Sequence, residues 1–474
     1  MLFSSFLFLF WFLPAALLLY FALPPLIWHI SGGRMGARGL LFLRNVILLF
    51  LSLLFYGWGE PLYVFLMIAT VAANFLFGLW VAAASRPKAV LCLSIVFNLG
   101  LLFYFKYAAF FFGIFGISIP SPRMPIGISF YTFQALSYVA DVYWERVQAE
   151  RSAASFGAYV SLFPQLIAGP IVRYSDVASE LKERRHSTED AAAGARRFIA
   201  GLCKKVLLAN PAGALFHTLA ARSVGTLSLS GAWLALLCFS FQIYFDFSGY
   251  SDMAVGLGRI FGFRFPENFR YPYTAVSFTD FWRRWHITLS SFFKEYVYIP
   301  LGGSRHGTWR TVINLFAVWL LTGLWHGAGW NFALWGLYYF LFLVLEKFVL
   351  SRMLSRTPRA CRHILTLLGI LFGWLLFAFD GSEIYLTFPR LGAFLLALLG
   401  KNGAVLQNDL FDLVRHLPFL LIAALGCTPL PRAIFAKICK KRGTFGVILP
   451  FLGLLLSVCY LADSSFNPFL YFRF

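Results

Sequence analysis

Two histidines lie in stretches whose residue types could carry acid–base chemistry. His286 follows two arginines in FWRRWHITLS (281–290), and His326 lies in LTGLWHGAGWNF (321–332). A neutral imidazole, with an unperturbed pKa of about 6.5, can accept a hydroxyl proton in a transition state. The pair could therefore activate an alcohol for acyl transfer. In the alternative interpretation, each histidine is a structural hydrogen-bond partner.

Charged and small residues next to these histidines have possible roles in binding. Arg283 and Arg284 could hold a phosphate-bearing donor through the forked donors of guanidinium, or they could simply contact lipid headgroups. Gly323, Gly327 and Gly329 would let another helix or a substrate chain come close to His326.

Two aspartates interrupt the apolar stretch 242–253. Ionisable groups at membrane depth are costly and mark candidate sites, so Asp246 and Asp252 are candidates for binding substrate. Either one could instead be a buried ion-pair partner for Arg or His. The full set of expected donor- or substrate-binding residues is Arg283, Arg284, Trp285, Trp325, Asp246, Asp252 and Asn331.

Motifs of other familiar enzyme classes are absent from the sequence. It contains no HExxH, GxSxG, GxxxxGK[ST] or GxGxxG pattern. The seven cysteines are scattered and form no CxxC spacing, so neither a disulfide framework nor a zinc site is indicated. We expect no bound metal and no bound cofactor.

The elements that position these residues are predicted from composition. Of 474 residues, 60% are hydrophobic and 13% are charged, which excludes a soluble globular protein. The sequence predicts an all-α polytopic membrane protein, organised as one continuous domain over 1–474. Its net charge of +20 lies in short loops between apolar runs, which argues against nucleic-acid binding.

Apolar runs of about 20 residues predict twelve crossings. They are 3–23, 40–58, 61–84, 89–117, 126–144, 198–221, 231–257, 312–330, 331–349, 363–380, 416–430 and 443–463. The stretch 156–172 is broken by proline and glycine, so a re-entrant or in-plane element is expected there, and 388–400 is too short to cross.

The loops between these runs predict an orientation. With both termini outside, 33 of the 40 Lys and Arg residues lie in or beside inner loops. The longest inner loop contains the aromatic stretch 266–305, for which we expect short amphipathic helices that lie in the interface or fold back into the protein. Its Trp and Phe side chains are expected to be interface anchors.

Five motifs together resemble the membrane-bound O-acyltransferase family, and in particular its bacterial alginate O-acetylation branch. They are the two histidine stretches, MPIGISFYTFQALSYVADVY (124–143), FPQLIAGPIVR (163–173) and YFDFSGYSDMAVGLG (244–258). The resemblance covers about 90–345. Proteins of teichoic acid D-alanylation are similar but more distant.

The resemblance implies a ring of tilted helices around a thin centre, with funnels from both faces. It implies that His326 is the near-invariant catalytic histidine and that His286 is the second polar site residue, which is Asn in many eukaryotic relatives. It also implies acetyl-CoA as the inner donor, an outer-face acyltransferase as partner, and a location in the bacterial inner membrane.

The expected function is transfer of an acetyl group across the membrane for O-acetylation of an exported polysaccharide. One alternative is transfer of D-alanine or another acyl group to a cell-envelope polymer. A non-enzymatic alternative is a transporter or flippase for a lipid-linked glycan, in which His326 and Asp246 would form a proton relay.

Overall fold

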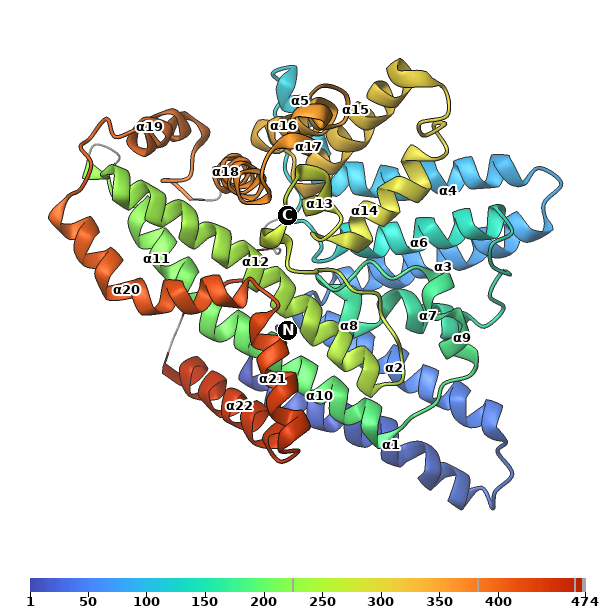
Figure 1. The fold of residues 1–474 in the computed structure, drawn as a ribbon. Helices are drawn as coiled ribbons and strands as arrows, with labels where there is room; N and C mark the ends of the chain where they lie inside the picture. Colours follow the sequence, from blue (N-terminus) through green and yellow to red (C-terminus); the bar gives the residue numbers. More distant parts are fainter. Residues whose placement is uncertain (224–225, 382, 464–465, 471–474) are drawn as a thin grey trace. The chain divides into compact units, whose positions relative to one another are not determined.

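The computed structural model describes residues 1–223, 226–381, 383–463 and 466–470. Throughout these ranges the regular structure is helical, and no strand occurs in them (Figure 1). This confirms the predicted all-α class. The chain divides into two compact units, and the expectation of a single domain stays a prediction.

Unit 1 comprises Met1–Gly201 and Tyr250–Glu267. Its helices are α1 (Leu13–Ile30), α2 (Ala37–Gly59), α3 (Tyr63–Ala83), α4 (Pro87–Leu102), α5 (Ala108–Ile114), α6 (Ile128–Tyr143), α7 (Ala153–Ser161), α8 (Phe163–Leu166), α9 (Tyr174–Lys182) and most of α10 (Thr188–Cys203).

Unit 2 comprises Leu202–Gly249 and Asn268–Phe474. Its helices are α11 (Asn210–Ala220), most of α12 (Leu229–Ile260), α13 (Phe278–Trp282), α14 (Ile287–Phe293), α15 (Gly307–His326), α16 (Trp330–Val344), α17 (Ser351–Arg356), α18 (Arg359–Ala378), α19 (Phe388–Leu398), α20 (Gln407–Gly426), α21 (Leu430–Lys441) and α22 (Phe445–Asp463).

Side chains in unit 1 are distributed as expected for a protein in lipid. Large apolar side chains such as Trp11 and Phe65 are exposed, whereas Asn74 and Asn98 are buried. The two carboxamides exchange hydrogen bonds of 2.9 and 2.8 Å between α3 and α4. Polar groups thus find partners inside the helix bundle, and apolar groups face outward.

Nine helical stretches in the described part of the chain are long and apolar enough to cross a membrane, or ten if the bent pair α20 and α21 is one span. The chain is therefore an integral multi-pass membrane protein. The other two expected crossings, 126–144 and 312–330, form α6 and α15, which fall outside this set. At 16 residues, α6 is shorter than the roughly 20 residues that a crossing needs, and the first turns of α15 contain Arg310, Thr311 and Asn314.

The expected interruptions are present. The stretch 156–172 forms α7 and α8, which are separated at Leu162, and it continues without a helix beyond Ile167. The stretch 388–400 forms the short helix α19, which is below spanning length.

The aromatic stretch 266–305 folds into short helices, as predicted, but its aromatic residues are not interface anchors. Phe281, Trp282, Trp285, Phe292 and Phe293 are all buried. Trp285 packs on Trp374 of α18 with ring centroids 4.6 Å apart, and Trp282 packs on Trp319 of α15 at 4.6 Å. Burying such large side chains contributes more than a position at the interface would, so this part of the stretch folds back into the protein.

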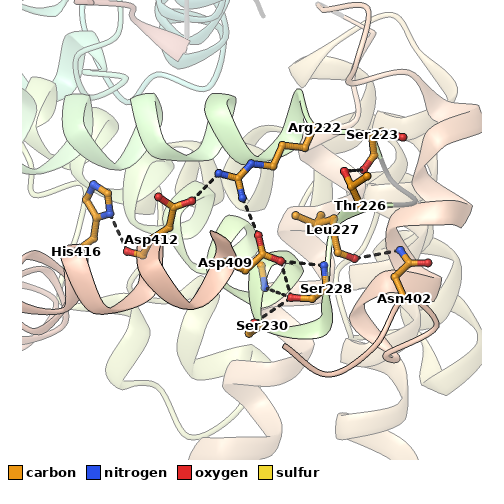
Figure 2. Close-up of polar contacts among 11 residues, drawn as sticks. Arg222, Ser223, Thr226, Leu227, Ser228, Ser230, Asn402, Asp409, Asp412 and His416 are labelled. Carbon is orange, nitrogen blue, oxygen red and sulfur yellow. Dashed lines mark hydrogen bonds and ion pairs between the residues drawn. The ribbon is translucent and has the colours of Figure 1, made fainter. Parts of the chain in front are cut away.

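A polar cluster joins the start of α20 to the start of α12 within unit 2 (Figure 2). Asp409 accepts hydrogen bonds from the backbone N–H and the hydroxyl of Ser228, at 3.0 and 2.5 Å. Arg222 bridges Asp409 and Asp412 through two 2.6 Å contacts. The Asp409 carboxylate therefore neutralises a guanidinium and satisfies a donor at a helix start.

Candidate active site

His286 occupies a tightly constrained backbone position directly before α14. Its φ of 43° and ψ of 54° lie in the left-handed region, which few residues other than glycine adopt. The backbone N–H of Ile287 donates to the carbonyl of Asn268 at 3.0 Å, and the N–H of Arg270 donates to the carbonyl of Arg284 at 2.9 Å. These bonds tie the segment before α13 to the turn that carries His286. Strain of this kind is typical of functional positions.

Asn268 determines which nitrogen of His286 is protonated. The Asn268 Oδ1 atom receives the backbone N–H of Thr288 at 3.3 Å and the Thr288 hydroxyl at 2.9 Å. Because a backbone N–H can only donate, the atom that it faces is the carboxamide oxygen. His286 Nδ1 lies 3.1 Å from the same oxygen and must therefore donate to it. The lone pair of the imidazole is then on Nε2.

The Nε2 atom of His286 is buried and has no hydrogen-bond partner among the described residues. The whole residue is 1% exposed, and burial lowers the pKa of the His286 imidazole to about 3. The ring is consequently neutral at physiological pH. A neutral imidazole with a free lone pair can accept a proton or a hydrogen bond from a substrate.

His326 is the last residue of α15 and is enclosed by aromatic rings. Its ring centroid lies 4.9 Å from Trp325, 5.0 Å from Trp335 of α16 and 5.2 Å from Phe377 of α18. The residue is 2% exposed. Such a surrounding lowers the local dielectric and strengthens any electrostatic interaction that the imidazole makes with a bound group.

The two histidines belong to one aromatic cluster in unit 2. The Trp325 ring contacts both imidazoles, with its centroid 5.8 Å from that of His286 and 4.9 Å from that of His326. Phe247 of α12 packs edge-on against His286 at 4.6 Å. The structure therefore brings the predicted catalytic residues together, although they are 40 positions apart in sequence.

Glycines place α15 and α16 in very close contact beside His326. A Cβ atom added to Gly323 would lie 2.4 Å from the Phe332 carbonyl oxygen and 3.2 Å from the Cα of Gly336. A Cβ at Gly327 would lie 2.2 Å from the Phe332 ring. This confirms that Gly323 and Gly327 allow a neighbouring helix to approach.

The arginines and the tryptophan before His286 have different surroundings. Arg283 is exposed. Arg284 pairs with Asp280 at 2.7 Å and donates to Thr274, so its guanidinium already has protein partners. Trp285 is buried in the aromatic cluster. Of these three, Arg283 is therefore the residue whose surroundings best suit contact with a phosphate.

Both predicted aspartates form ion pairs. Asp246 pairs with Lys205 at 2.7 Å, with both side chains buried, and its other oxygen accepts the backbone N–H of Leu470 at 2.8 Å. Asp252 pairs with Arg197 at 2.9 Å in unit 1. Asp252 thus pairs with an arginine, as the structural interpretation expects, but it is half-buried rather than buried, and the partner of buried Asp246 is lysine rather than Arg or His. The role of either aspartate in substrate binding stays a prediction.

Asn331, in the first turn of α16, is nearly buried. Its Nδ2 atom has no partner among the residues described. An unpaired amide donor in a buried position can serve to bind a carbonyl or hydroxyl oxygen. Its predicted role in substrate binding stays a prediction.

Two residues of this region were not predicted from the sequence. Asn268 orients His286 from 18 positions upstream, and Lys205 neutralises Asp246 from the π-helical segment Lys204–Ala209 that joins α10 to α11. Asp246 lies in an apolar stretch, which was a signal that a cation must be near it. The predicted inner loop 173–205 contains eight Lys and Arg residues, however, and the sequence does not indicate which of them is the partner. Nothing in the sequence around Asn268 points to its role.

Comparison with known proteins identifies relatives over the whole chain. A model of the membrane-bound O-acyltransferase family matches residues 148–386. The chain is 36% identical to a protein named probable alginate O-acetylase AlgI from Azotobacter vinelandii, across 100% of both chains. It is 34% identical to the peptidoglycan O-acetyltransferase of Helicobacter pylori, across 86% of this chain and 81% of that protein. It is 26% identical to the teichoic acid D-alanyltransferase of Bacillus subtilis, across 73% and 88%.

Proposed function

Because the chain belongs to the membrane-bound O-acyltransferase family, we propose that it transfers an acetyl group for the O-acetylation of an exported polysaccharide. Two relatives that are at least 34% identical over most of the chain are named for O-acetylation of alginate and of peptidoglycan. Both of these acceptors are polysaccharides. These relatives support an acyltransferase that serves a polysaccharide acceptor, directly or through a partner.

In the proposed reaction, a hydroxyl oxygen attacks the carbonyl carbon of an acetyl thioester. A carbon–oxygen bond forms and the carbon–sulfur bond breaks. His326 accepts the hydroxyl proton as general base and then returns it to the thiolate that leaves. His286 assists by accepting a hydrogen bond at Nε2, which orients the hydroxyl or the donor.

The observation that carries this proposal is the buried, neutral imidazole of His286 with its lone pair on Nε2. The His286 ring contacts the Trp325 ring, which in turn contacts the ring of His326. A structural histidine in such a core would be expected to use both nitrogens. Here one ring nitrogen has been fixed as the donor, which leaves the other as an acceptor within an apolar cluster.

The remaining components of the proposal rest on the resemblance to the family and on the distribution of basic residues. The donor is acetyl-CoA on the inner side. An acyltransferase at the outer face completes transfer to the polysaccharide. The protein lies in the bacterial inner membrane with both termini outside, as the distribution of basic residues favours.

Replacement of His326 tests the function directly. In cells that carry His326→Ala, the exported polymer should lose its acetyl groups while its amount is unchanged, as measured by mass analysis of the purified polymer. His29→Ala, at an exposed histidine of α1, is the matched control and should leave the acetyl content unchanged. Loss of the polymer itself would instead support the transporter, and an unchanged acetyl content would end the proposal.

The similarity to a teichoic acid D-alanyltransferase supports D-alanyl transfer as a second candidate. Both reactions are acyl transfers, for which the same general base would serve. Mild alkaline release of the ester-linked group distinguishes them, because acetate and alanine differ in mass and only alanine carries an amine.

A further inference from the structure

Two arginines in unit 1 face one tyrosine ring without a carboxylate partner. Arg44 lies on α2, and Arg184 lies between α9 and α10. Their guanidinium carbons are 5.8 and 5.7 Å from the centroid of the Tyr20 ring. In the described part of the chain neither forms an ion pair with Asp or Glu, although Glu180 acts on Arg184 at longer range.

Three guanidinium nitrogens in this cluster are buried and lack hydrogen-bond partners among the described residues. They are Nε of Arg44 and Nε and Nη1 of Arg184. Arg184 is 8% exposed, and its Nη2 donates to Asn45 Oδ1 at 2.7 Å. A buried cation with unpaired donors is unfavourable unless an anion completes it.

The neighbouring histidine, His186, is neutral, so it neither adds to the positive charge of the two arginines nor offsets it. The Tyr20 hydroxyl donates to the carbonyl of Phe261 at 3.0 Å, so it must accept from His186 Nε2 at 2.9 Å. His186 Nδ1 then carries the lone pair and faces Arg44 at 3.5 Å. Burial and the two arginines lower the pKa of His186 to about 4, so the ring is neutral. Within the described residues, the cluster therefore carries two positive charges with no carboxylate in direct contact.

An open cavity borders the cluster. Gly262 and Phe263 line it, and the Arg184 side chain packs against both, with its guanidinium carbon 4.4 Å from the centre of the Phe263 ring. The other charged groups of the lining are balanced, since three arginines and three carboxylates take part and Arg259 pairs with Asp190 at 2.7 Å. The excess charge is thus on Arg44 and Arg184, outside the lining itself, and Arg184 reaches the cavity wall through its contacts with Gly262 and Phe263.

We propose that Arg44 and Arg184 bind a phosphate group at this end of unit 1. A phosphate offers negative charge and several acceptor oxygens to the three unpaired guanidinium N–H groups. Two sources can supply it: the headgroup of an anionic phospholipid, or a soluble phosphate compound such as coenzyme A. The phospholipid assignment uses neither His286 nor His326 and does not depend on the proposed reaction, whereas the coenzyme A assignment rests on the proposed function, in which acetyl-CoA is the donor.

Binding measurements on the purified full-length protein test the site and identify the source. One arm measures retention of phosphatidylglycerol against phosphatidylcholine by native mass spectrometry. The other arm measures coenzyme A binding by calorimetry. Affinity in one arm should fall at least about tenfold in Arg44→Gln and in Arg184→Gln, because each removes one guanidinium from the phosphate.

Matched controls are available on the same segments. Arg38→Gln on α2 and Lys182→Gln in the last turn of α9 remove exposed cations outside the cavity lining and should change affinity less than about twofold. Since Arg184→Gln also removes the bond to Asn45, Arg44→Gln carries the test if that variant does not fold. A folded Arg44→Gln protein that binds both probes as tightly as the unaltered protein would overturn the proposal, and so would a protein that binds neither.

Discussion

At the scale of single residues, the Asn268 carboxamide sets the chemistry of His286. One oxygen accepts from the backbone N–H and hydroxyl of Thr288 and from His286 Nδ1. Without this oxygen, three buried donors lose their acceptor and the imidazole can rotate or exchange its tautomer. The residue therefore acts as a positioning residue.

Replacing Asn268 should reduce acetyl transfer without removing either histidine. We expect Asn268→Leu to lower the acetylation rate about tenfold or more, because His286 Nε2 is no longer held as the acceptor. Asn268→Asp keeps an oxygen at this position and should retain most of the activity. Acetyl content of the polymer at equal protein levels is the measurement. Equal activity of the Leu variant and the unaltered protein would contradict the role.

The candidate site was only partly predictable from the sequence. His286 and His326 could be found because each lies in a recognisable motif, and Asp246 and Asp252 because a charge in an apolar stretch is conspicuous. Asn268 was not predictable, because its contact depends on how the chain returns after α13. The ion pair of Arg284 with Asp280 was also missed, although the four-residue spacing is a known signal for such a pair.

At the scale of helices, the contact between α15 and α16 positions His326. Gly323 lies one turn before His326, where a side chain would collide with the Phe332 carbonyl and with Gly336. The two helices can keep their spacing only while this position has no side chain.

Gly323→Ala should therefore push α15 away from α16 and move the His326 ring. The expected result is a loss of stability of about 1–3 kcal/mol together with reduced acetylation. Gly392→Ala on α19 is the control, since an added Cβ there meets nothing within 4 Å. Thermal unfolding in detergent and polymer acetyl content are the two measurements. A Gly323→Ala protein that matches the control in both would contradict this account.

The cluster around Asp409 holds the start of α20 against the start of α12 (Figure 2). Asp409→Ala should lower the free energy of unfolding by about 2–3 kcal/mol, because it leaves the Ser228 N–H and part of the Arg222 charge unsatisfied. Asp412→Ala should cost less, since the Asp412 side chain is more exposed and its carboxylate pairs with Arg222, whereas the contact with His416 uses the Asp412 backbone carbonyl, which the variant keeps. Equal unfolding midpoints for the two variants would argue against the ranking.

Hydropathy predicted the helices better than it predicted their environment. Most of the expected crossings coincide with helices of spanning length, because a run of apolar residues is a direct signal. The placement of Trp282 and Trp285 was wrong, because an aromatic residue suits an interface and a core equally well by composition. Only the packing partners Trp319 and Trp374 distinguish the two.

At the scale of the whole molecule, buried neutral histidines make stability depend on pH. The pKa of His286 is lowered to about 3 in the folded protein, from about 6.5 in the unfolded chain. The unfolded chain therefore binds a proton that the folded protein excludes. The stability contribution is complete above pH of about 6.5 and decreases as the pH falls toward 3.

Unfolding measured between pH 8 and pH 4.5 should show this decrease, by up to about 1.4 kcal/mol for each pH unit below 6.5 from His286 alone. His186 acts in the same direction, because its pKa is also lowered. His286→Asn should reduce the slope, whereas His29→Asn at an exposed position should not. An identical slope in all three proteins would show that His286 titrates normally.

The proposed orientation can be tested at exposed sites on opposite faces. In a chain without its native cysteines, Arg415→Cys on α20 should react with an impermeant maleimide added to intact spheroplasts, and Arg38→Cys on α2 should not. The reverse pattern would invert the assignment. The predicted side of the C-terminus involves residues 471–474, which lie outside the described part of the chain.

The left-handed backbone of His286 has a consequence for how this enzyme family can diverge. Histidine and asparagine are among the few residues with a side chain that tolerate such a conformation, whereas a β-branched residue does not. An imidazole and a carboxamide can thus be interchanged here without rebuilding the surrounding loop. A single substitution at this position can therefore replace a proton acceptor with a hydrogen-bond donor. Comparing His286→Asn with His286→Val would separate the two effects, because Asn removes the imidazole but tolerates the backbone conformation, whereas Val removes the imidazole and does not tolerate it.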